Sequence, residues 1–353
     1  MPKYAHNSDF FAPMALFMPP SDPSVAPAAD AFQAPFWLTH RHAQTLYGAL
    51  FVPQARPRWQ RQRWTTPDDD FIDVDLLEGK GDAPVLVIFH GLEGSTDSRY
   101  VRALAHSAQR AGWAVVAPNF RGCSGIMNRL PRTYHAGDSA EIQWILARVR
   151  SRHAHVPLHA VGISLGGNML LKWLGEQGPQ ASRLLTCAAA VAAPLDLHAV
   201  GDHLARGFNR IYTHHFLTTL KQKAQLKFNQ YPGLFDLAAT LKARNLREFD
   251  DRFMAPLHGF SDVNDYWTRC SSKPWLTGIR VPTLLLNAQD DPFVPQAVLP
   301  QEQQCAAGVI RDFPARGGHV GFVTGPFPGQ ISWMPGRVMQ FFLDPHDGAR
   351  SVR

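Results

Sequence analysis

Short apolar runs alternate along this chain with segments of helical periodicity. Residues 71–77 alternate polar and apolar side chains, as in a strand with one exposed face. Continuous apolar runs, typical of parallel strands buried on both faces, cover 85–91, 114–120, 158–164, 184–191, 282–289 and 309–313. Helices are expected over 100–111, 138–150, 165–176, about 296–306 and 331–343. The alternation predicts an α/β fold with a doubly wound, mostly parallel sheet.

The alternation of strand and helix patterns begins only near residue 71 and is interrupted once, after the strand expected at 184–191. Residues 196–275 show no buried-strand pattern and carry charged, histidine and aromatic residues at helix-like spacing, which predicts a mainly helical insertion. The core is then expected over 35–195 and 276–345. Residues 1–34 are interpreted as a loosely ordered extension, because prolines interrupt its apolar pieces and exclude a membrane span there. Contact of this extension with a membrane surface stays open.

A serine lies between two glycines where a predicted strand hands over to a predicted helix, in Gly162-Ile163-Ser164-Leu165-Gly166. In such a turn a Cβ at either glycine would collide with neighbouring backbone, and the serine oxygen projects into a cleft. The pattern alone is weak, because it also occurs in ordinary glycine-rich turns. Its position at the carboxyl end of a buried strand, where doubly wound sheets bind ligands, favours a nucleophile.

A serine hydroxyl needs a base, and the base needs a group that orients it. Two adjacent carboxylates, Asp290 and Asp291, end the penultimate predicted strand, and His319 follows the last one between glycines. Serine, acid and histidine thus follow three predicted strands in that chain order. We favour Asp291 over Asp290 as the acid, because Pro292 would start a turn that directs it toward the histidine loop.

Backbone N–H groups are expected to bind the oxyanion that forms during acyl transfer. Leu165, directly after the serine, supplies one. The sequence HGLEGS at 90–95 follows the buried strand 85–89 and makes the N–H of Leu92 the second. Gly91 fits the same loop, although a glycine-rich turn would need it in any case.

Charge and cysteine spacing argue against two other classes of function. The net charge is +6, but lysines and arginines are scattered without a basic run, so no nucleic-acid partner is expected. The four cysteines, Cys123, Cys187, Cys270 and Cys305, form no CxxC pair. We therefore expect reduced thiols, no metal site and a cytoplasmic location. The oligomeric state stays open.

The chain resembles the α/β-hydrolase superfamily, in particular its YheT-like branch, related to the ABHD-type esterases and lipases of animals. The resemblance covers about 35–343 and rests on the blocks PFWLTHRHAQTLYGAL, HGLEGS, NFRGCSG, GISLGGN, FDDRFMAPLHGFSDVNDYW, NAQDDPFVP and GGHVGF. It implies ester hydrolysis through an acyl-enzyme, without a cofactor. By motif it implies Ser164 as nucleophile, His319 as base, Asp291 as orienting acid, and Leu92 and Leu165 as oxyanion donors.

In related enzymes the inserted segment acts as a lid. Its aromatic residues, Phe249, Phe253, Phe260, Tyr266 and Trp267, either line an acyl pocket or pack the lid on the body. The leading hypothesis is a serine esterase for short or medium acyl esters, with acylglycerols among the candidates. Acyl transfer to an acceptor other than water and a non-catalytic binding protein of the same fold are the alternatives.

Overall fold

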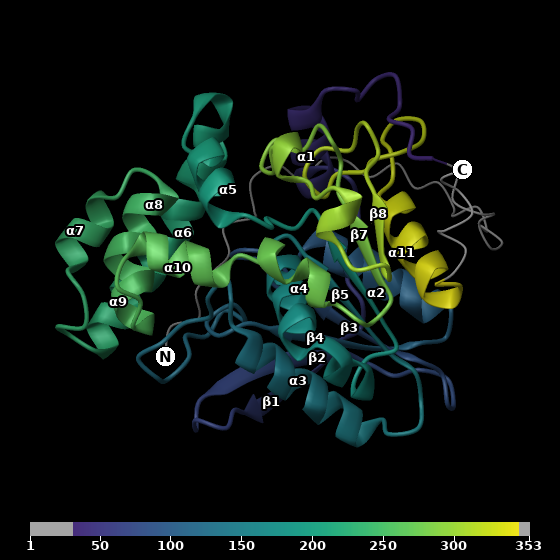
Figure 1. The fold of residues 1–353 in the computed structure, drawn as a ribbon, viewed down its shortest axis with the longest axis horizontal. Helices are drawn as coiled ribbons and strands as arrows, with labels where there is room; N and C mark the ends of the chain where they lie inside the picture. The colour runs from purple at the N-terminus through teal and green to yellow at the C-terminus, as the bar shows by residue number, and fades with distance from the viewer. Residues whose placement is uncertain (1–30, 346–353) are drawn as a thin grey trace.

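The computed structural model describes residues 31–345, and an eight-stranded sheet forms its centre (Figure 1). The strands are β1 (Gln60–Thr65), β2 (Phe71–Leu77), β3 (Val85–Phe89), β4 (Ala114–Asn119), β5 (Leu158–Ile163), β6 (Cys187–Val191), β7 (Thr283–Leu286) and β8 (Val309–Asp312). Their order is β1-β2-β4-β3-β5-β6-β7-β8. β2 pairs antiparallel with β1 and β4, and every other pair is parallel. The predicted mostly parallel sheet is confirmed.

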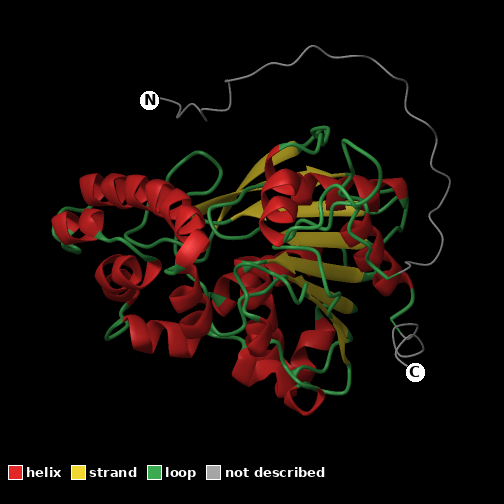
Figure 2. Cartoon of the chain, turned by 90° about the horizontal axis from the view of Figure 1, so that it is seen from above, coloured by secondary structure: helices red, strands yellow, loops and turns green. Residues whose placement is uncertain are grey.

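Helices cover both faces of this sheet (Figure 2). They are α2 (Arg99–Arg110), α3 (Ser139–Arg152), α4 (Leu165–Gln177) and α11 (Trp333–Leu343). Val87 of β3 belongs to the apolar cluster that includes α3 and α4, and the next residue, Ile88, to the cluster that includes α2 and α11. Because successive strand residues point to opposite faces, a strand covered on both must be apolar throughout.

Between β6 and β7 the chain forms only helices and turns. The helices are α5 (Leu197–Leu204), α6 (Arg210–Gln230), α7 (Leu237–Lys242), α8 (Leu246–Phe249), α9 (Ala255–His258) and α10 (Val263–Cys270), with a π-helical turn at Asp250–Met254. Helices α6 to α10 gather to one side of the sheet, at the left of Figure 1. This is the segment predicted as a helical insertion, and its action as a lid stays a prediction.

The edge strand β1 was not predicted, because its side chains are exposed apart from Trp64. Trp64 packs into the core, and charge pairs hold the exposed part of the strand: Arg61 lies opposite Asp75 in the register and Arg63 opposite Asp73, with N–O distances of 2.7 and 2.8 Å. These pairs also bury both aspartates, so the expectation that 71–77 exposes one face is wrong. A charged edge strand resists pairing with other chains.

The helix predicted over about 296–306 is also wrong. The chain forms two short 3-10 turns there, Gln296–Val298 and Glu302–Gln304. Pro300 lies between them, and proline has no N–H to donate and clashes with the preceding turn of an α-helix. The apolar and polar pattern matched a helix, but this one residue prevents it.

Most of the predicted N-terminal extension, 1–30, lies outside the described residues. Within 31–345, no helix is both long enough and apolar enough to cross a membrane. The first described helix is α1 (Arg41–Leu50), which the sequence pattern did not predict. Its contacts belong to the site.

Candidate active site

Ser164 occupies the turn between β5 and α4 with φ of 51° and ψ of −120°, a left-handed region that non-glycine residues rarely adopt. Close backbone approach surrounds it. A Cβ added to Gly162 would lie 2.4 Å from the carbonyl oxygen of Gly166, and one added to Gly166 would lie 2.5 Å from that of His90. Neither position accepts a side chain unless the backbone moves, so both must be glycine in this turn.

The structure brings the predicted serine, histidine and aspartate together. His319 Nε2 lies 3.0 Å from Ser164 Oγ, and Nδ1 lies 2.9 Å from Asp291 Oδ2. The Phe293 ring stacks on the imidazole, with ring centroids 4.1 Å apart and planes at 20°. Asp291 is 2% exposed, so the imidazole is held between a buried carboxylate, an aromatic face and the serine hydroxyl.

The two neighbouring aspartates have different partners. Asp291 Oδ1 accepts backbone N–H groups of Phe293 and Val294 at 2.7 and 3.1 Å, which fixes the carboxylate toward His319. Asp290 instead accepts the N–H of Gly318 at 3.0 Å, and burial raises its pKa. The structure therefore places Asp291 next to the imidazole and Asp290 on the backbone of the histidine loop.

Helix α1 supports the histidine loop from the other end of the chain. Thr45 Oγ1 accepts the N–H of His319 at 2.9 Å. Gln44 bridges the same loop, accepting the N–H of Val323 at 2.8 Å and donating to its carbonyl at 3.1 Å. Sequence reasoning missed these roles; the only signal was the resemblance of the block that contains this helix.

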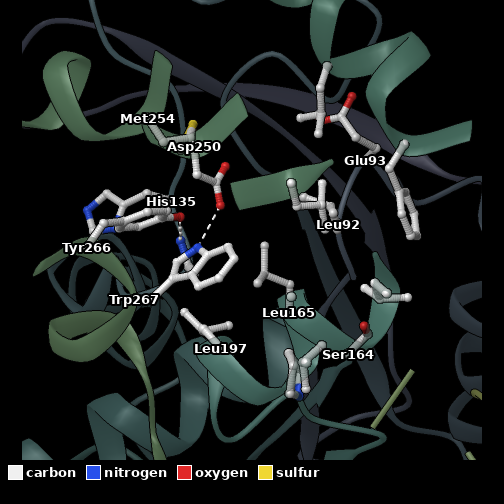
Figure 3. Close-up of a pocket in the computed structure, with 18 of the residues that line it drawn as sticks. Leu92, Glu93, His135, Ser164, Leu165, Leu197, Asp250, Met254, Tyr266 and Trp267 are labelled. Carbon is white, nitrogen blue, oxygen red and sulfur yellow. Dashed lines mark hydrogen bonds between the residues drawn. The ribbon is translucent and has the colours of Figure 1, made fainter. Parts of the chain in front are cut away.

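The N–H groups of Leu92 and Leu165 are available to an anion near the serine. Both residues line the same cleft as Ser164 (Figure 3). Among residues 31–345, neither N–H has a hydrogen-bond acceptor. The N–H of Gly91 is not available, because it donates to Tyr100 Oη at 2.9 Å. Two N–H donors in the cleft of the nucleophile are what an oxyanion site requires.

His90 fixes the loop that carries Leu92. Its Nε2 accepts the N–H of Phe120 at 3.0 Å, so Nδ1 carries the proton and donates to the carbonyl of Gly91 at 2.8 Å. Burial lowers the pKa of His90 to about 4. The ring is therefore neutral at pH 7 and joins the loops after β3 and β4 without adding charge to the site.

The cleft beside Ser164 has an empty volume of about 960 Å³, part of it open to solvent. Its walls are mostly apolar and come from both the core and the insertion, for example Leu92, Leu165, Leu197, Leu204, Phe216 and Leu220. Of the five aromatic residues considered for an acyl pocket, Phe253, Tyr266 and Trp267 line the cleft, and Phe249 and Phe260 do not. This size and lining suit a ligand with an apolar chain.

Asp250 lines the cleft and has no ion-pair partner within 31–345. Its Oδ2 accepts the indole N–H of Trp267 at 2.7 Å (Figure 3). Burial raises the pKa of Asp250 to about 7 in spite of this bond. The folded protein thus holds this proton more tightly than the unfolded chain, whose aspartates titrate near 3.8. Folding stability is therefore lost as pH rises from about 4 to about 7.

We expect Asp250→Asn to remove this loss, because asparagine keeps an oxygen for Trp267 and carries no charge. The melting temperature should rise by a few degrees, ~2–5 °C, at pH 8 and change little at pH 4. Thermal unfolding of both proteins between pH 4 and 8 measures this. Asp82→Asn removes an exposed aspartate and serves as the control. Parallel pH dependences for wild type and Asp250→Asn would contradict the assignment.

Within the described chain, no group of three or more His, Cys, Asp or Glu residues is arranged to hold a metal ion. All four cysteines are free thiols, and Cys305 is the least buried of them. What the cleft offers from its own residues is a hydroxyl, an imidazole, a buried carboxylate and two N–H donors.

Known proteins are similar to this chain in sequence or in fold. A family model described as alpha/beta hydrolase fold matches residues 84–326. The candidate esterase YheT of Escherichia coli (strain K12) is 40% identical over 304 residues, which cover 84% of this chain and 88% of YheT. Phospholipase ABHD3 of Mus musculus is 28% identical over 322 residues, 88% of this chain and 78% of ABHD3. The structure of the Pyrococcus furiosus esterase Pf2001 superposes with a TM-score of 0.51 at 15% identity, covering 83% and 98% of the two chains.

Proposed function

Because this chain belongs to the alpha/beta hydrolase family and to its YheT- and ABHD-like branch, we propose that it cleaves carboxylic esters through an acyl-enzyme on Ser164. One observation carries the proposal: an unbroken line of contacts from Asp291 through His319 to Ser164 at the wall of an apolar cleft. The esterase and phospholipase names of the relatives support a hydrolase with small-molecule substrates.

The first half of the reaction forms the acyl-enzyme. Ser164 Oγ attacks the ester carbonyl while His319 Nε2 takes its proton, and Asp291 stabilises the imidazolium through Nδ1–H. The negative charge that develops on the carbonyl oxygen is bound by the N–H groups of Leu92 and Leu165. Collapse of this intermediate breaks the ester C–O bond, and the imidazolium protonates the departing alcohol.

The second half regenerates the enzyme. A water molecule attacks the acyl carbon, and His319 takes a proton from it. The same two N–H groups bind the second oxyanion. When the intermediate collapses, Ser164 leaves with the proton held by His319 and the carboxylic acid is released.

The apolar walls of the cleft support an acyl chain as the part of the substrate that is recognised. Each buried methylene contributes about 0.8 kcal/mol to binding, so chain length should change kcat/KM measurably. We propose short or medium acyl esters as substrates, with acylglycerols as candidates. A panel of p-nitrophenyl esters from acetate to palmitate would locate the preferred length.

A fluorophosphonate probe tests the proposed nucleophile directly. We expect labelling of the purified protein at Ser164, because its Oγ displaces fluoride only when a base removes its proton. Mass spectrometry locates the modified residue, and His319→Ala should abolish most of the labelling. Folded protein that is not labelled would contradict the proposal and favour the non-catalytic alternative.

A further inference from the structure

The residue after the proposed oxyanion donor Leu92 is held in an unusual conformation. Glu93 has φ of 54°, outside the regions that a glutamate ordinarily adopts. Tyr134 holds it twice: its hydroxyl accepts the Glu93 N–H at 2.9 Å and donates to Oε1 at 2.9 Å. Tyr134 thus holds the peptide that follows Leu92 at its N–H, and the same hydroxyl also binds the Glu93 carboxylate.

A lysine from the insertion completes this arrangement. Lys223 of α6 donates to Glu93 Oε1 at 2.8 Å, and the two side chains are only 19% and 6% exposed. The same ammonium lies 3.2 Å from Cys123 Sγ, in the loop after β4. One cation of the insertion thus contacts the two loops that follow β3 and β4. Loss of this partner would leave the Glu93 carboxylate buried without a counter-charge, which strongly destabilises this arrangement.

Lys223 is not the only attachment of α6 to the core. Lys227, one turn further along α6, is fully buried and donates to the carbonyl oxygens of Asn128 and Leu130 at 3.1 and 2.8 Å. The helix is therefore anchored on the loop before α3 without Lys223. What Lys223 adds is a contact to the residue next to the oxyanion donor.

We propose that Lys223 is a positioning residue: through its ion pair with Glu93 it holds the Leu92 N–H in the orientation that binds the oxyanion. The insertion then sets the reactivity of Ser164, because α6 supplies the cation that keeps the loop after β3 in its strained form. This inference rests on the proposed ester hydrolysis.

Two variants of opposite charge separate positioning from a direct effect of the ammonium's field. Lys223→Met removes a cation near the oxyanion, and Glu93→Gln removes an anion. If the charge itself stabilised the oxyanion, the two changes would have opposite effects on the rate. If the pair positions Leu92, both lower it, and the double variant is no worse than the poorer single one.

The experiment measures hydrolysis of p-nitrophenyl butyrate and inhibition by phenylboronic acid, whose tetrahedral adduct on a serine places an oxygen in the oxyanion site. We expect Lys223→Met and Glu93→Gln each to lower kcat by about 10- to 100-fold, less than the 10²–10³ for loss of a whole donor, with little change in KM. The inhibition constant of the boronate should rise by a similar factor. Lys223→Arg should recover most of the loss.

The matched control is Lys221→Met, which removes the same charge from α6 where the lysine donates to the carbonyl of Ala243 within the insertion. Melting temperatures of all variants identify a general loss of folding. Suppose that the wild type is active. If Lys223→Met then has the same kcat as Lys221→Met, or if Glu93→Gln hydrolyses the ester faster than wild type, the positioning role alone is overturned. If the wild type shows no ester hydrolysis that the boronate inhibits, the proposed function is overturned, and the positioning role with it.

Discussion

Ser164→Ala is expected to reduce kcat/KM for p-nitrophenyl butyrate by about 10⁴- to 10⁶-fold, because no other group in the cleft replaces the attacking oxygen. Fold and stability should be nearly unchanged, since alanine has the same Cβ and meets the same strain at φ of 51°. Initial rates of purified protein, with a thermal unfolding curve for each sample, measure both quantities.

Ser182→Ala provides the matched control for this variant. Ser182 is exposed and its hydroxyl donates to the carbonyl of Pro179, in the 3-10 turn Gly178–Arg183 after α4, whose first residue follows Ser164. We expect it to keep wild-type activity. The serine mechanism would be refuted by a Ser164→Ala protein that is folded and still hydrolyses the ester at a rate near that of wild type.

Asp291→Asn should lower kcat by about 10⁴-fold while leaving KM close to its original value. An amide cannot stabilise the imidazolium, and its NH₂ group next to Nδ1 favours the tautomer that protonates Nε2, which then cannot accept the serine proton. The Asp291 carboxylate also accepts two backbone N–H groups, and the asparagine oxygen is expected to keep these two bonds, which leaves the NH₂ group facing Nδ1. Two measurements on wild type and variant locate the loss: the steady-state rate of hydrolysis between pH 5 and 9, and the rate of acylation in a single turnover, which reports the chemical step.

Asp290→Asn is the neighbouring control, with the same chemical change one residue away. Asparagine keeps an acceptor for the Gly318 N–H, so the histidine loop should stay in place and the rate should fall less than about tenfold. Equal losses in the two variants would mean that both carboxylates orient the histidine, and a larger loss at Asp290 would reverse the assignment.

Local sequence patterns were sufficient for the strands buried on both faces, and they pointed to three residues that the structure brings together. A strand buried on both faces must be apolar throughout, and a tight strand-to-helix turn requires small residues, so β3, β5 and the glycines around Ser164 carry their own signal. The order of Ser164, Asp291 and His319 follows from the order of the strands that they end. The structure places these three within hydrogen-bonding distance.

The same patterns failed where a single residue or an exposed segment decided the outcome. Pro300 divides a helix-like segment into two short turns, and β1 is held by arginine–aspartate pairs that an apolar pattern does not register. Asp250 gave no signal either, because its raised pKa comes from burial in the folded protein.

The sequence by itself determined which residues carry the functional groups that the proposed chemistry needs, and the alternation that brings them to one edge of a parallel sheet. Only the tertiary structure decided how they are supported. Thr45 contacts His319 across 274 positions of the chain, and Lys223 contacts Glu93 across 130. Periodicity reports on neighbours within a few turns or along one strand, whereas such contacts depend on how whole elements pack. Charge pairs and hydrogen bonds of this kind become specific only when burial removes water as the competing partner.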